Sequence, residues 1–537
     1  MKALTAKFNL LNTFLINIIG GNRFMDYVVG IDIGTTSTKA VLYTLHGDIK
    51  GYSNQLYPLI QDKPDMAEED PDVIFNATIT ALSDVVKNAD GRVRAVSFST
   101  QQHSLVGLDA DHKPLTNVIT WADNRAEKQA TELGKNGQGM KIYNKTGLPI
   151  HPMGPVYKLL WLKQDETELF NKTSYWVGIK EYVLWRFFHQ LKEETAMAAT
   201  TGLMNIFKMD WDEDIMKFVG IKREQLPELV DPKDQLSGMD PKLADQIGIP
   251  ADTPFVMGAT DGALAEIGLG AIGKGEVAVT IGTSGAVRTF IDKPQLDPKG
   301  RTYCYPVMDG KWIVGGPVNN GGIVFRWVRD NLFGPEKETA RMLDMDPYDL
   351  LTDIAKKVPA GSDGLIFHPF IGGERAPIWN GNARGSFFGL TRNHTRAHMV
   401  RAALEGVVYN LYTVQLALQE AVGEPTLITA TGGFARSALW RQMLADIFEH
   451  PVTIPEAFES GCLGAMTVAL MSIGEADDMS VVKKFIGKQN TYQPDPANFK
   501  NYRDLLPIYL NVGRKLEGEY DSIAEYQRQH PNPGNKE

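Results

Sequence analysis

The amino-acid sequence predicts an α/β protein built from two similar halves. Segments with the pattern of buried strands alternate with segments that have the spacing of amphipathic helices. A hairpin rich in glycine and threonine occurs twice, roughly half the chain apart. The chain has 537 residues, of which 43% are hydrophobic, and this is enough for two large domains, each with its own core.

The first hairpin is VVGIDIGTTSTKAVLY, residues 28–43. Two apolar runs flank a turn that contains Gly34 and several hydroxyl groups, which is typical of a β-hairpin. Such a turn can direct backbone N–H groups, hydroxyls and the Lys39 ammonium group at a phosphate, while Asp32 is placed to hold a hydrated Mg²⁺. The pattern favours a nucleotide as ligand. An ordinary hairpin, in which Gly34 supplies only an unusual dihedral angle, is the alternative.

Strand and helix patterns continue between the two hairpins. DVIFNATITALSDVVKNA, residues 72–89, predicts an amphipathic helix, and VRAVSFST, residues 93–100, predicts a strand. TPFVMGA, residues 253–259, predicts a buried strand that leads into the helix pattern TDGALAEIGLGAIG. RAHMVRAALEGVVYNLYTVQLALQEA, residues 396–421, is a long helical stretch in the second half.

The second hairpin is EVAVTIGTSGAVRTF, residues 276–290, in which Gly282 corresponds to Gly34. Position, flanking apolar strands and hydroxyl content all agree between the two hairpins. We therefore predict a duplication, with two domains of similar topology that face each other across a cleft. The glycine-rich stretch at residues 268–274 is the predicted boundary, which gives a first domain at residues 25–268 and a second at residues 269–537.

The segment before Met25 has two lysines ahead of an apolar run, as a signal peptide does. Three asparagines interrupt that run, no A-x-A cleavage site follows it, and its apolar part is too short to span a bilayer. We therefore expect residues 1–24 to be a disordered or non-native extension ahead of a functional start at Met25.

Charge and cysteine content restrict the kinds of partner. The formal net charge is −10 and no long basic run occurs, which argues against nucleic acid or an anionic membrane as the main partner. An anionic ligand must then be held by local donors. The two cysteines, Cys304 and Cys462, lie far apart in the sequence and lack metal-ligand spacing, so we expect neither a disulfide framework nor a zinc site, and a reducing cytoplasm fits.

Asp261 is the candidate catalytic residue. It lies where a predicted buried strand meets a helix, and its small neighbours Gly258, Ala259 and Gly262 let a ligand approach the backbone closely. A carboxylate there can accept the proton of an attacking hydroxyl, as a general base does in phosphoryl transfer. A helix N-cap is the structural alternative. The second hairpin follows within one helix and one strand, which favours the catalytic role.

A third glycine turn occurs in LITATGGFARSALWRQMLADIF, residues 427–448. The chain passes from an apolar strand through Gly432 and Gly433 into a helix that begins near Ser437, an arrangement that suits the adenosine part of a nucleotide. A further pair, Gly321 and Gly322, opens another helix and can line the same pocket. Glycine pairs between strand and helix also occur for purely steric reasons.

Polar and aromatic side chains of the first half form a candidate substrate site. SFSTQQHSLVGLD provides Gln102 and His103, and VITWADNRAEKQA provides Trp121 and Arg125. Amides and an imidazole can hydrogen-bond the hydroxyls of a polyhydroxylated substrate, and an indole offers a flat wall for its C–H faces. Trp121 can instead belong to the core, and Arg125 can be the partner of a salt bridge.

Taken together, these motifs resemble the FGGY carbohydrate kinases, members of the actin-like and ribonuclease H-like ATPase superfamily. The resemblance extends over nearly the whole chain from about Asp26. GIDIGTTSTKA resembles the first phosphate motif of the family, GATDGALAEIG its catalytic-base motif, TIGTSGAV its second phosphate motif and TGGFARSALWRQMLADI its adenosine motif. GERAPIWNGNARGSFFGL, residues 373–390, and ESGCLGAM, residues 459–466, also resemble family segments.

The resemblance implies two ribonuclease H-like domains that face each other across a catalytic cleft, with ATP and Mg²⁺ bound between them. It implies Asp261 as the general base and Asp32 beside the Mg²⁺. It also implies that Thr35, Thr36, Lys39 and Thr283 surround the phosphates, that Gly322, Gly432, Gly433 and Ser437 line the nucleotide pocket, and that Gln102, His103, Trp121 and Asp261 face the sugar.

Within the family, STQQHSLVGLD and ITWADNRA are most similar to the gluconate kinase branch. Glycerol kinases carry Arg-Glu where this chain has Gln102-His103, which disfavours glycerol. Xylulose kinases carry Met-His there, and Asn-Asp-Gly-Arg follows their tryptophan where this chain has residues 122–125, Ala-Asp-Asn-Arg.

We therefore expect an ATP-dependent kinase that converts D-gluconate to 6-phospho-D-gluconate in the cytoplasm. A kinase of the same fold that acts on D-xylulose or another ketose is the nearest alternative. An actin-like ATPase would leave Gln102, His103 and Trp121 without a ligand, and a non-catalytic sugar sensor has no use for Asp261. A homodimer is one assembly that the resemblance leaves open.

A gluconate substrate requires a local positive charge, because the whole chain is acidic. Arg125, Lys180 in VGIKEYVLW and a protonated His103 are the three candidates for binding its carboxylate.

Overall fold

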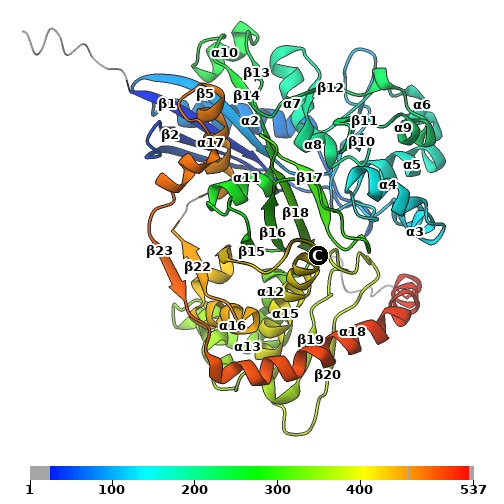
Figure 1. Ribbon diagram of the computed structural model, residues 1–537, viewed down its shortest axis with the longest axis vertical. Helices are drawn as coiled ribbons and strands as arrows, with labels where there is room; N and C mark the ends of the chain where they lie inside the picture. Colours follow the sequence, from blue (N-terminus) through cyan, green and yellow to red (C-terminus); the bar gives the residue numbers. More distant parts are fainter. Residues whose placement is uncertain (1–24, 457–458, 531–537) are drawn as a thin grey trace, which may run out of the picture.

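Two mixed β-sheets with the same strand order form the framework of the molecule, and helices cover their faces (Figure 1). The computed structural model describes residues 25–456 and 459–530. The predicted extension at residues 1–24 lies outside the described residues.

The first sheet has six strands in the order β13-β14-β5-β1-β2-β3. Its strands are β1 (Asp26–Ile33), β2 (Ser37–Thr44), β3 (Ile49–Leu56), β5 (Arg92–Thr100), β13 (Gln235–Leu236) and β14 (Phe255–Thr260). Strands β1, β5 and β14 run parallel to one another, whereas β2, β3 and β13 pair antiparallel with their neighbours. The predicted hairpin at residues 28–43 and the predicted strands at residues 93–100 and 253–259 are all confirmed.

The second sheet has seven strands in the order β17-β18-β16-β15-β21-β22-β23. Its strands are β15 (Glu276–Ile281), β16 (Gly285–Ile291), β17 (Tyr303–Pro306), β18 (Trp312–Val318), β21 (Leu427–Thr431), β22 (Val452–Pro455) and β23 (Gln489–Tyr492). Here β15, β21 and β22 are parallel, and β16, β18 and β23 pair antiparallel. Apart from the added β17, this repeats the first sheet strand for strand, so the predicted duplication is confirmed.

Helices pack on both sheets. They include α2 (Pro71–Val86), α7 (Ile179–Phe188), α11 (Asp261–Gly268), α15 (Arg396–Val422), α16 (Ala438–Phe448), α17 (Ser460–Ser472) and α18 (Pro496–Gln529). Helix α2 fulfils the prediction at residues 72–89: Asp70 caps its first turn and Pro71 occupies the first helical position. Its buried residues, among them Ile74, Ile79 and Leu82, recur at the spacing of one helix face.

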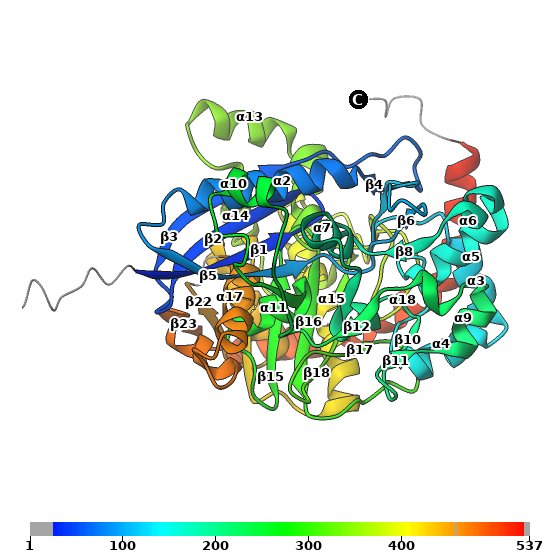
Figure 2. The ribbon, with the colours of Figure 1, turned by 90° about the horizontal axis from the view of Figure 1, so that it is seen from above.

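Further helices lie in the first half of the chain, between the strands of the first sheet. They are α3 (Glu127–Lys135), α4 (Gln138–Thr146), α5 (Pro155–Asp165), α6 (Thr167–Lys172), α8 (Thr195–Ala199), α9 (Glu213–Val219) and α10 (Pro241–Ile247). Seen from above, α3, α4, α6 and α9 gather on the side of the molecule opposite α17 (Figure 2). The loops around α5 and α8 carry side chains of the candidate site described below.

Helix α17 belongs to the second half of the sequence but packs on the first sheet. It contacts β1, β5 and α11, and its orange ribbon lies beside the blue strands in Figure 1. At Gly30 of β1, a Cβ atom would lie 2.1 Å from the carbonyl oxygen of Cys462 in α17, so only glycine permits this approach. The predicted division at residue 268 separates the two sheets along the chain, and α17 then joins the two halves.

The main core is shared between the halves. Buried residues of β16 and β17, among them Phe290 and Tyr305, pack in one cluster with first-half residues such as Tyr157 and with Cys462 of α17.

Both cysteines are buried and free, as expected. In the described part of the chain, no helix is long and apolar enough to cross a membrane.

We predict that Gly30→Ala destabilises the protein. The added methyl group would meet the α17 backbone, and overpacking of this kind costs about 1–3 kcal/mol. Urea unfolding followed by far-UV circular dichroism would measure the shift of the midpoint to lower urea. Gly518→Ala is the matched control, because no atom of another described part of the chain lies within 4 Å of its Cβ position in α18. That variant should gain up to about 1 kcal/mol from helix propensity. Equal midpoints for Gly30→Ala and the unmodified protein would contradict the packing of α17 on β1.

Candidate active site

Asp261 lies at the start of α11, directly after β14. The N-cap of α11 is Thr260, whose hydroxyl accepts a hydrogen bond from the Ala263 N–H, so Asp261 is the first helical residue and is not the cap. Its Oδ1 accepts a hydrogen bond of 2.7 Å from the Gly262 N–H. Burial raises the pKa of Asp261, while the charge of Arg288, the Gly262 N–H and Gln102 act in the opposite direction and favour the carboxylate.

Asp32 stands near Asp261 because their strands are parallel neighbours of β5. In the sheet register Asp32 lies beside Ser99, and Thr260 lies beside Thr100. The carboxyl ends of three parallel strands therefore meet at one edge, which is where ligands bind in open α/β sheets. The Ser99 hydroxyl donates a hydrogen bond of 2.6 Å to Asp32 Oδ1. Burial raises the pKa of Asp32 to about 6, and the negative charge of Asp261 acts in the same direction.

This pair of carboxylates fits a hydrated Mg²⁺ better than a metal held by many side chains. Among the described residues, no group of three or more histidine, cysteine, aspartate or glutamate side chains could hold a metal ion. Mg²⁺ commonly binds through one or two carboxylates and completes its shell with water and substrate phosphates. Asp32 is half-buried at the edge of the sheet and its Oδ2 is not engaged by Ser99.

The first hairpin places Lys39 opposite Asp32 in register. Lys39 Nζ forms an ion pair of 2.7 Å with Glu459, the residue before α17, so this lysine joins the first hairpin to the second half of the chain. Thr35 lies in the turn, where its hydroxyl donates to Gln101 Oε1 and accepts from Trp121 Nε1 at 2.9 Å. Thr36 is exposed at the tip of the turn.

Four predicted nucleotide-binding residues line one cavity of about 270 Å³ in the second half of the molecule. They are Thr283, Gly322, Gly433 and Ser437, and the cavity wall also includes the aromatic residues Phe325, Phe434, Tyr348 and Trp440. Ser437 caps α16 by accepting the Trp440 N–H at 3.2 Å. Gly432 lies behind this wall with φ of +113°, and a Cβ atom there would lie 2.3 Å from the Ile281 carbonyl oxygen. A flat adenine ring between aromatic and glycine surfaces is chemically compatible with such a cavity.

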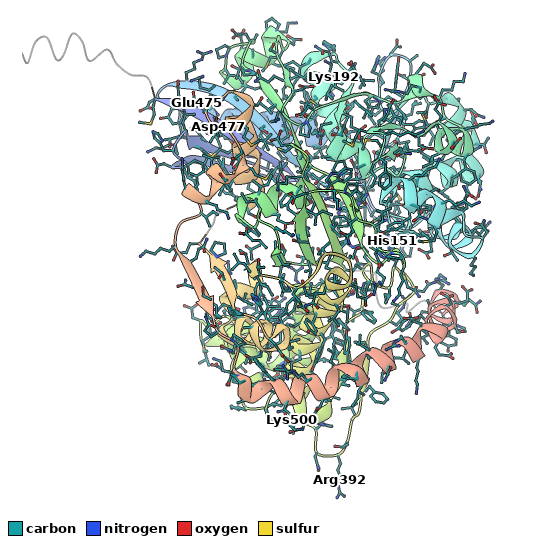
Figure 3. All side chains as sticks on the ribbon, in the orientation of Figure 1. His151, Lys192, Arg392, Glu475, Asp477 and Lys500 are labelled. Atoms are coloured by element: carbon teal, nitrogen blue, oxygen red, sulfur yellow. The ribbon has the colours of Figure 1, made fainter. Side chains whose placement is uncertain are left out.

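Two buried histidines provide complementary hydrogen-bonding atoms. His103 Nδ1 lies 2.8 Å from the Thr200 carbonyl oxygen, so it donates, and Nε2 of the neutral ring is an acceptor. His151 Nδ1 accepts from the Met153 N–H at 3.2 Å, so its Nε2 carries the hydrogen and is a donor. Burial lowers the pKa of each ring to about 3, and both are therefore neutral at physiological pH. Figure 3 shows His151 at the junction of the upper and lower halves.

Lys158 of α5 joins the loops that carry His103 and Trp121. Its ammonium group is fully buried and donates to the carbonyl oxygens of His103 at 2.7 Å, Ile119 at 3.1 Å and Thr120 at 2.7 Å. Three donors meet three acceptors, so this side chain ties the two loops together, in addition to the backbone hydrogen bonds between Leu105 and Ile119.

Trp121 forms one face of the same region. The guanidinium of Arg375 lies over its ring at 4.4 Å from the centroid. The positive charge of Arg375 acts on Asp261, His103 and His151, which places it among the predicted substrate residues. Gln102 reaches Gly262, where a Cβ atom would lie 2.8 Å from its Nε2.

The structure contradicts all three candidates for binding a substrate carboxylate. Arg125 is held by the carboxylates of Glu68 and Asp123, which agrees with the alternative prediction that it is the partner of a salt bridge. Lys180 is fully buried and forms an ion pair with Glu194. His103 is neutral because burial lowers its pKa, so it supplies no positive charge.

Sequence reasoning missed Arg288, Arg375, His151, Lys158 and Glu459. Arg288 lies inside the second hairpin, which is recognised by its glycines and hydroxyls, and Arg375 lies inside residues 373–390, which resemble a family segment. A cationic residue within a phosphate-type hairpin is a signal that could have indicated Arg288. No local pattern marks His151 or Lys158, because their roles depend on contacts between loops that are distant in sequence.

Comparison with known proteins agrees with this architecture. The N-terminal domain of the FGGY family of carbohydrate kinases matches residues 27–268, and the C-terminal domain of that family matches residues 277–473. The chain is 49% identical to gluconokinase from Bacillus subtilis (strain 168) over 504 residues, which cover 94% of this chain and 98% of that protein.

Solved structures with the same fold include two proteins from Lactobacillus acidophilus. One is described as a gluconate kinase and the other as a ligand-bound xylulose kinase. Each has a TM-score of 0.88 and 42% sequence identity, and each alignment covers 93% of this chain and 100% of the other.

We predict that Lys158→Met lowers the free energy of unfolding by about 1–3 kcal/mol, because it removes three buried hydrogen bonds and leaves the His103 carbonyl oxygen without another donor among the described residues. Urea unfolding followed by tryptophan fluorescence would measure it. The matched control is Lys172→Met, which removes only an exposed ion pair with Glu168 and should change stability by no more than about 0.5 kcal/mol. Equal effects of the two substitutions would show that Lys158 does not hold the loops.

Proposed function

Because the chain belongs to the FGGY family of carbohydrate kinases, we propose that it transfers the terminal phosphoryl group of ATP to D-gluconate and forms 6-phospho-D-gluconate. The observation that carries this proposal is the position of Asp261, on the strand edge next to Asp32 and the first hairpin. The identity to a gluconokinase over nearly the full chain supports the choice of substrate.

In the proposed mechanism, Asp261 accepts the proton of the attacking terminal hydroxyl. Its carboxylate must be ionised for this step, and the nearby charges of Arg288 and Arg375 favour the ionised form against the effect of burial. The Gly262 N–H and the Gln102 side chain hold this carboxylate in place. Asp261 therefore orients the nucleophile as well as deprotonating it.

The two hairpins support the phosphates in this proposal. Thr35 and Thr36 belong to the first turn, and Thr283 and Gly322 line the cavity below the second. Bound Mg²⁺ would neutralise charge on the transferring phosphoryl group, and Asp32 is the residue that would hold it. Lys39 contributes a further positive charge at this edge and also forms the ion pair with Glu459.

The sugar binds, in our proposal, between Trp121 and the two histidines. His103 Nε2 accepts a hydrogen bond from one hydroxyl, and His151 Nε2–H donates to another oxygen. Gln102 adds an amide next to Asp261. Closure of the two halves would exclude water from ATP.

A kinase for D-xylulose or another ketose is the second candidate. The description of one similar structure as a xylulose kinase favours it, at the same identity as the gluconate kinase. A ketose also presents several hydroxyls to His103, His151 and Gln102.

We infer that the reaction takes place in the cytoplasm, where ATP is available. A homodimer stays a prediction.

Coupled ADP release with Mg·ATP would test the proposed function. The panel contains D-gluconate, D-xylulose, L-ribulose and glycerol. Selective release with D-gluconate supports the proposal, and selective release with a ketose replaces its substrate. Nucleotide binding without turnover on any sugar would favour an actin-like ATPase or a sugar sensor.

We predict that Asp261→Asn lowers kcat by about 10²- to 10⁴-fold, because the amide cannot accept the proton of the hydroxyl. ATP affinity, measured by isothermal titration calorimetry, should change by less than about twofold. The control is Asp214→Asn, which also alters the first turn of a helix but lies exposed on α9. Loss of turnover together with loss of ATP binding would identify Asp261 as a structural residue.

We predict that the Mg²⁺ concentration needed for half-maximal rate rises below pH 6, by up to about tenfold for each pH unit. The pKa of Asp32 is about 6, so protons compete with Mg²⁺ for its carboxylate below that value and leave it free above. The same measurement on Asp32→Asn is the control that separates protonation of ATP from protonation of Asp32. That variant should need more Mg²⁺ at pH 8 and lose most of the added pH dependence. An identical pH dependence in both proteins would contradict the role of Asp32.

A further inference from the structure

Arg375 is a buried cation whose hydrogen-bonding capacity is largely unused. Its exposed fraction is 7%, its Nη2 donates to the Val318 carbonyl oxygen at 3.2 Å, and its Nε has no partner among the described residues. A guanidinium has five N–H donors, so most of them are available to a ligand. Burial also lowers the pKa of Arg375 to about 10, as expected of a charge that the protein compensates poorly.

The acidic residue next to Arg375 is occupied by other donors. Glu374 accepts hydrogen bonds from the side chains of Asn320 at 2.9 Å and Asn410 at 2.7 Å. It also accepts from the backbone N–H groups of Asn319 and Arg375 itself. Four donors satisfy this carboxylate, so it forms no hydrogen bond with the Arg375 guanidinium.

A second arginine of the chain provides the comparison. The Arg125 guanidinium also lies over a tryptophan ring, that of Trp161, at 4.4 Å from the centroid. Arg125 is held in addition by the carboxylates of Asp123 and Glu68. The two arginines share the aromatic contact, but Arg375 is the more deeply buried of the two and forms no ion pair with a carboxylate among the described residues. The missing partner of Arg375 is therefore an anion that comes from outside the chain.

The surroundings of Arg375 identify that anion as part of the sugar substrate. It lies over Trp121, and its charge acts on His103, His151 and Asp261, which are the groups proposed to bind and activate the sugar. Arg288 is placed differently, because a Cβ atom on Gly262, the residue after Asp261, would lie 3.2 Å from its Nε. Arg288 therefore belongs to the reacting end, and Arg375 lies over the tryptophan wall.

We propose that Arg375, with the His151 Nε2–H as a second donor, forms a subsite that binds the carboxylate of a sugar acid while the hydroxyl at the other end of the chain faces Asp261. This inference rests on the proposed function and names the residue that selects an acid over a neutral sugar. Bidentate binding by a guanidinium suits a planar carboxylate, and the aromatic contact holds that plane in place.

The test compares D-gluconate with D-glucitol, which has the same polyol chain with CH₂OH in place of the carboxylate. Binding of each is measured by isothermal titration calorimetry, and KM and kcat for D-gluconate are measured by coupled ADP release. The variants are Arg375→Gln, Arg375→Lys and, as matched control, Arg125→Gln. Thermal unfolding of each variant reports whether it is folded.

We expect the unmodified protein to bind gluconate more tightly than glucitol. Arg375→Gln should weaken gluconate binding by about 10- to 100-fold and leave glucitol binding within about twofold, since a hydrogen bond to a charged group is lost. KM for gluconate should rise by a similar factor, and kcat should fall much less. Arg375→Lys keeps a charge without the planar donor pair and should show an intermediate loss. Arg125→Gln should leave the ratio of gluconate to glucitol affinity unchanged.

Three results would overturn the subsite. In the first, gluconate and glucitol bind the unmodified protein equally well; in the second, Arg375→Gln weakens both ligands by the same factor. In the third, Arg125→Gln changes the affinity ratio as much as Arg375→Gln does. If Arg375→Gln does not fold, Arg375→Lys replaces it. A ratio of gluconate to glucitol affinity in Arg375→Lys equal to that of the unmodified protein would then overturn the subsite. Failure of the proposed function has a different signature, because the unmodified protein would then bind gluconate without phosphorylating it, or prefer a ketose.

Discussion

The structure depends on the burial of two neighbouring carboxylates, Asp32 and Asp261, at one edge of the first sheet. Parallel pairing of β1, β5 and β14 brings them together, and neither can be moved without changing the sheet. Burial and their mutual repulsion raise the pKa of Asp32 to about 6. Such an arrangement is costly in an empty protein and becomes favourable when cations or donors of a ligand enter.

The second half of the chain supplies the positive charges that this edge of the first sheet lacks. Arg288 comes from β16 and Arg375 from the loop after β19 (Ile366–His368), whereas Glu459, the residue before α17, pairs with Lys39 of the first hairpin. The core shared by β16, β17 and α17 holds these residues against the first sheet. The site is therefore assembled from both copies of the duplicated fold, and packing of α17 on β1 contributes to its geometry as well as to stability.

Local patterns were sufficient for the strands, the two hairpins and the helix that starts at Asp261, because periodicity and turn chemistry act over a few residues. The repeat then indicated the duplicated topology. Charge pairing could not be predicted this way. The sequence does not distinguish a cation that forms an ion pair within the chain from one that does not. Only the fold shows that carboxylates hold Arg125 and Lys180, in contrast to Arg375. The protonation of His103 depends likewise on burial, which one sequence does not specify.

The orientation of the sugar is the central claim, since it links Arg375 at one end of the substrate to Asp261 at the other. The position of the phosphate on the product tests it most directly. Phosphorus-31 NMR of the product formed from ATP and D-gluconate, with proton coupling, distinguishes an ester at the terminal CH₂ from one at a CH. The account predicts a single phosphomonoester coupled to two protons, at C6. A phosphate on an internal carbon, or an acyl phosphate at the carboxylate, would contradict it.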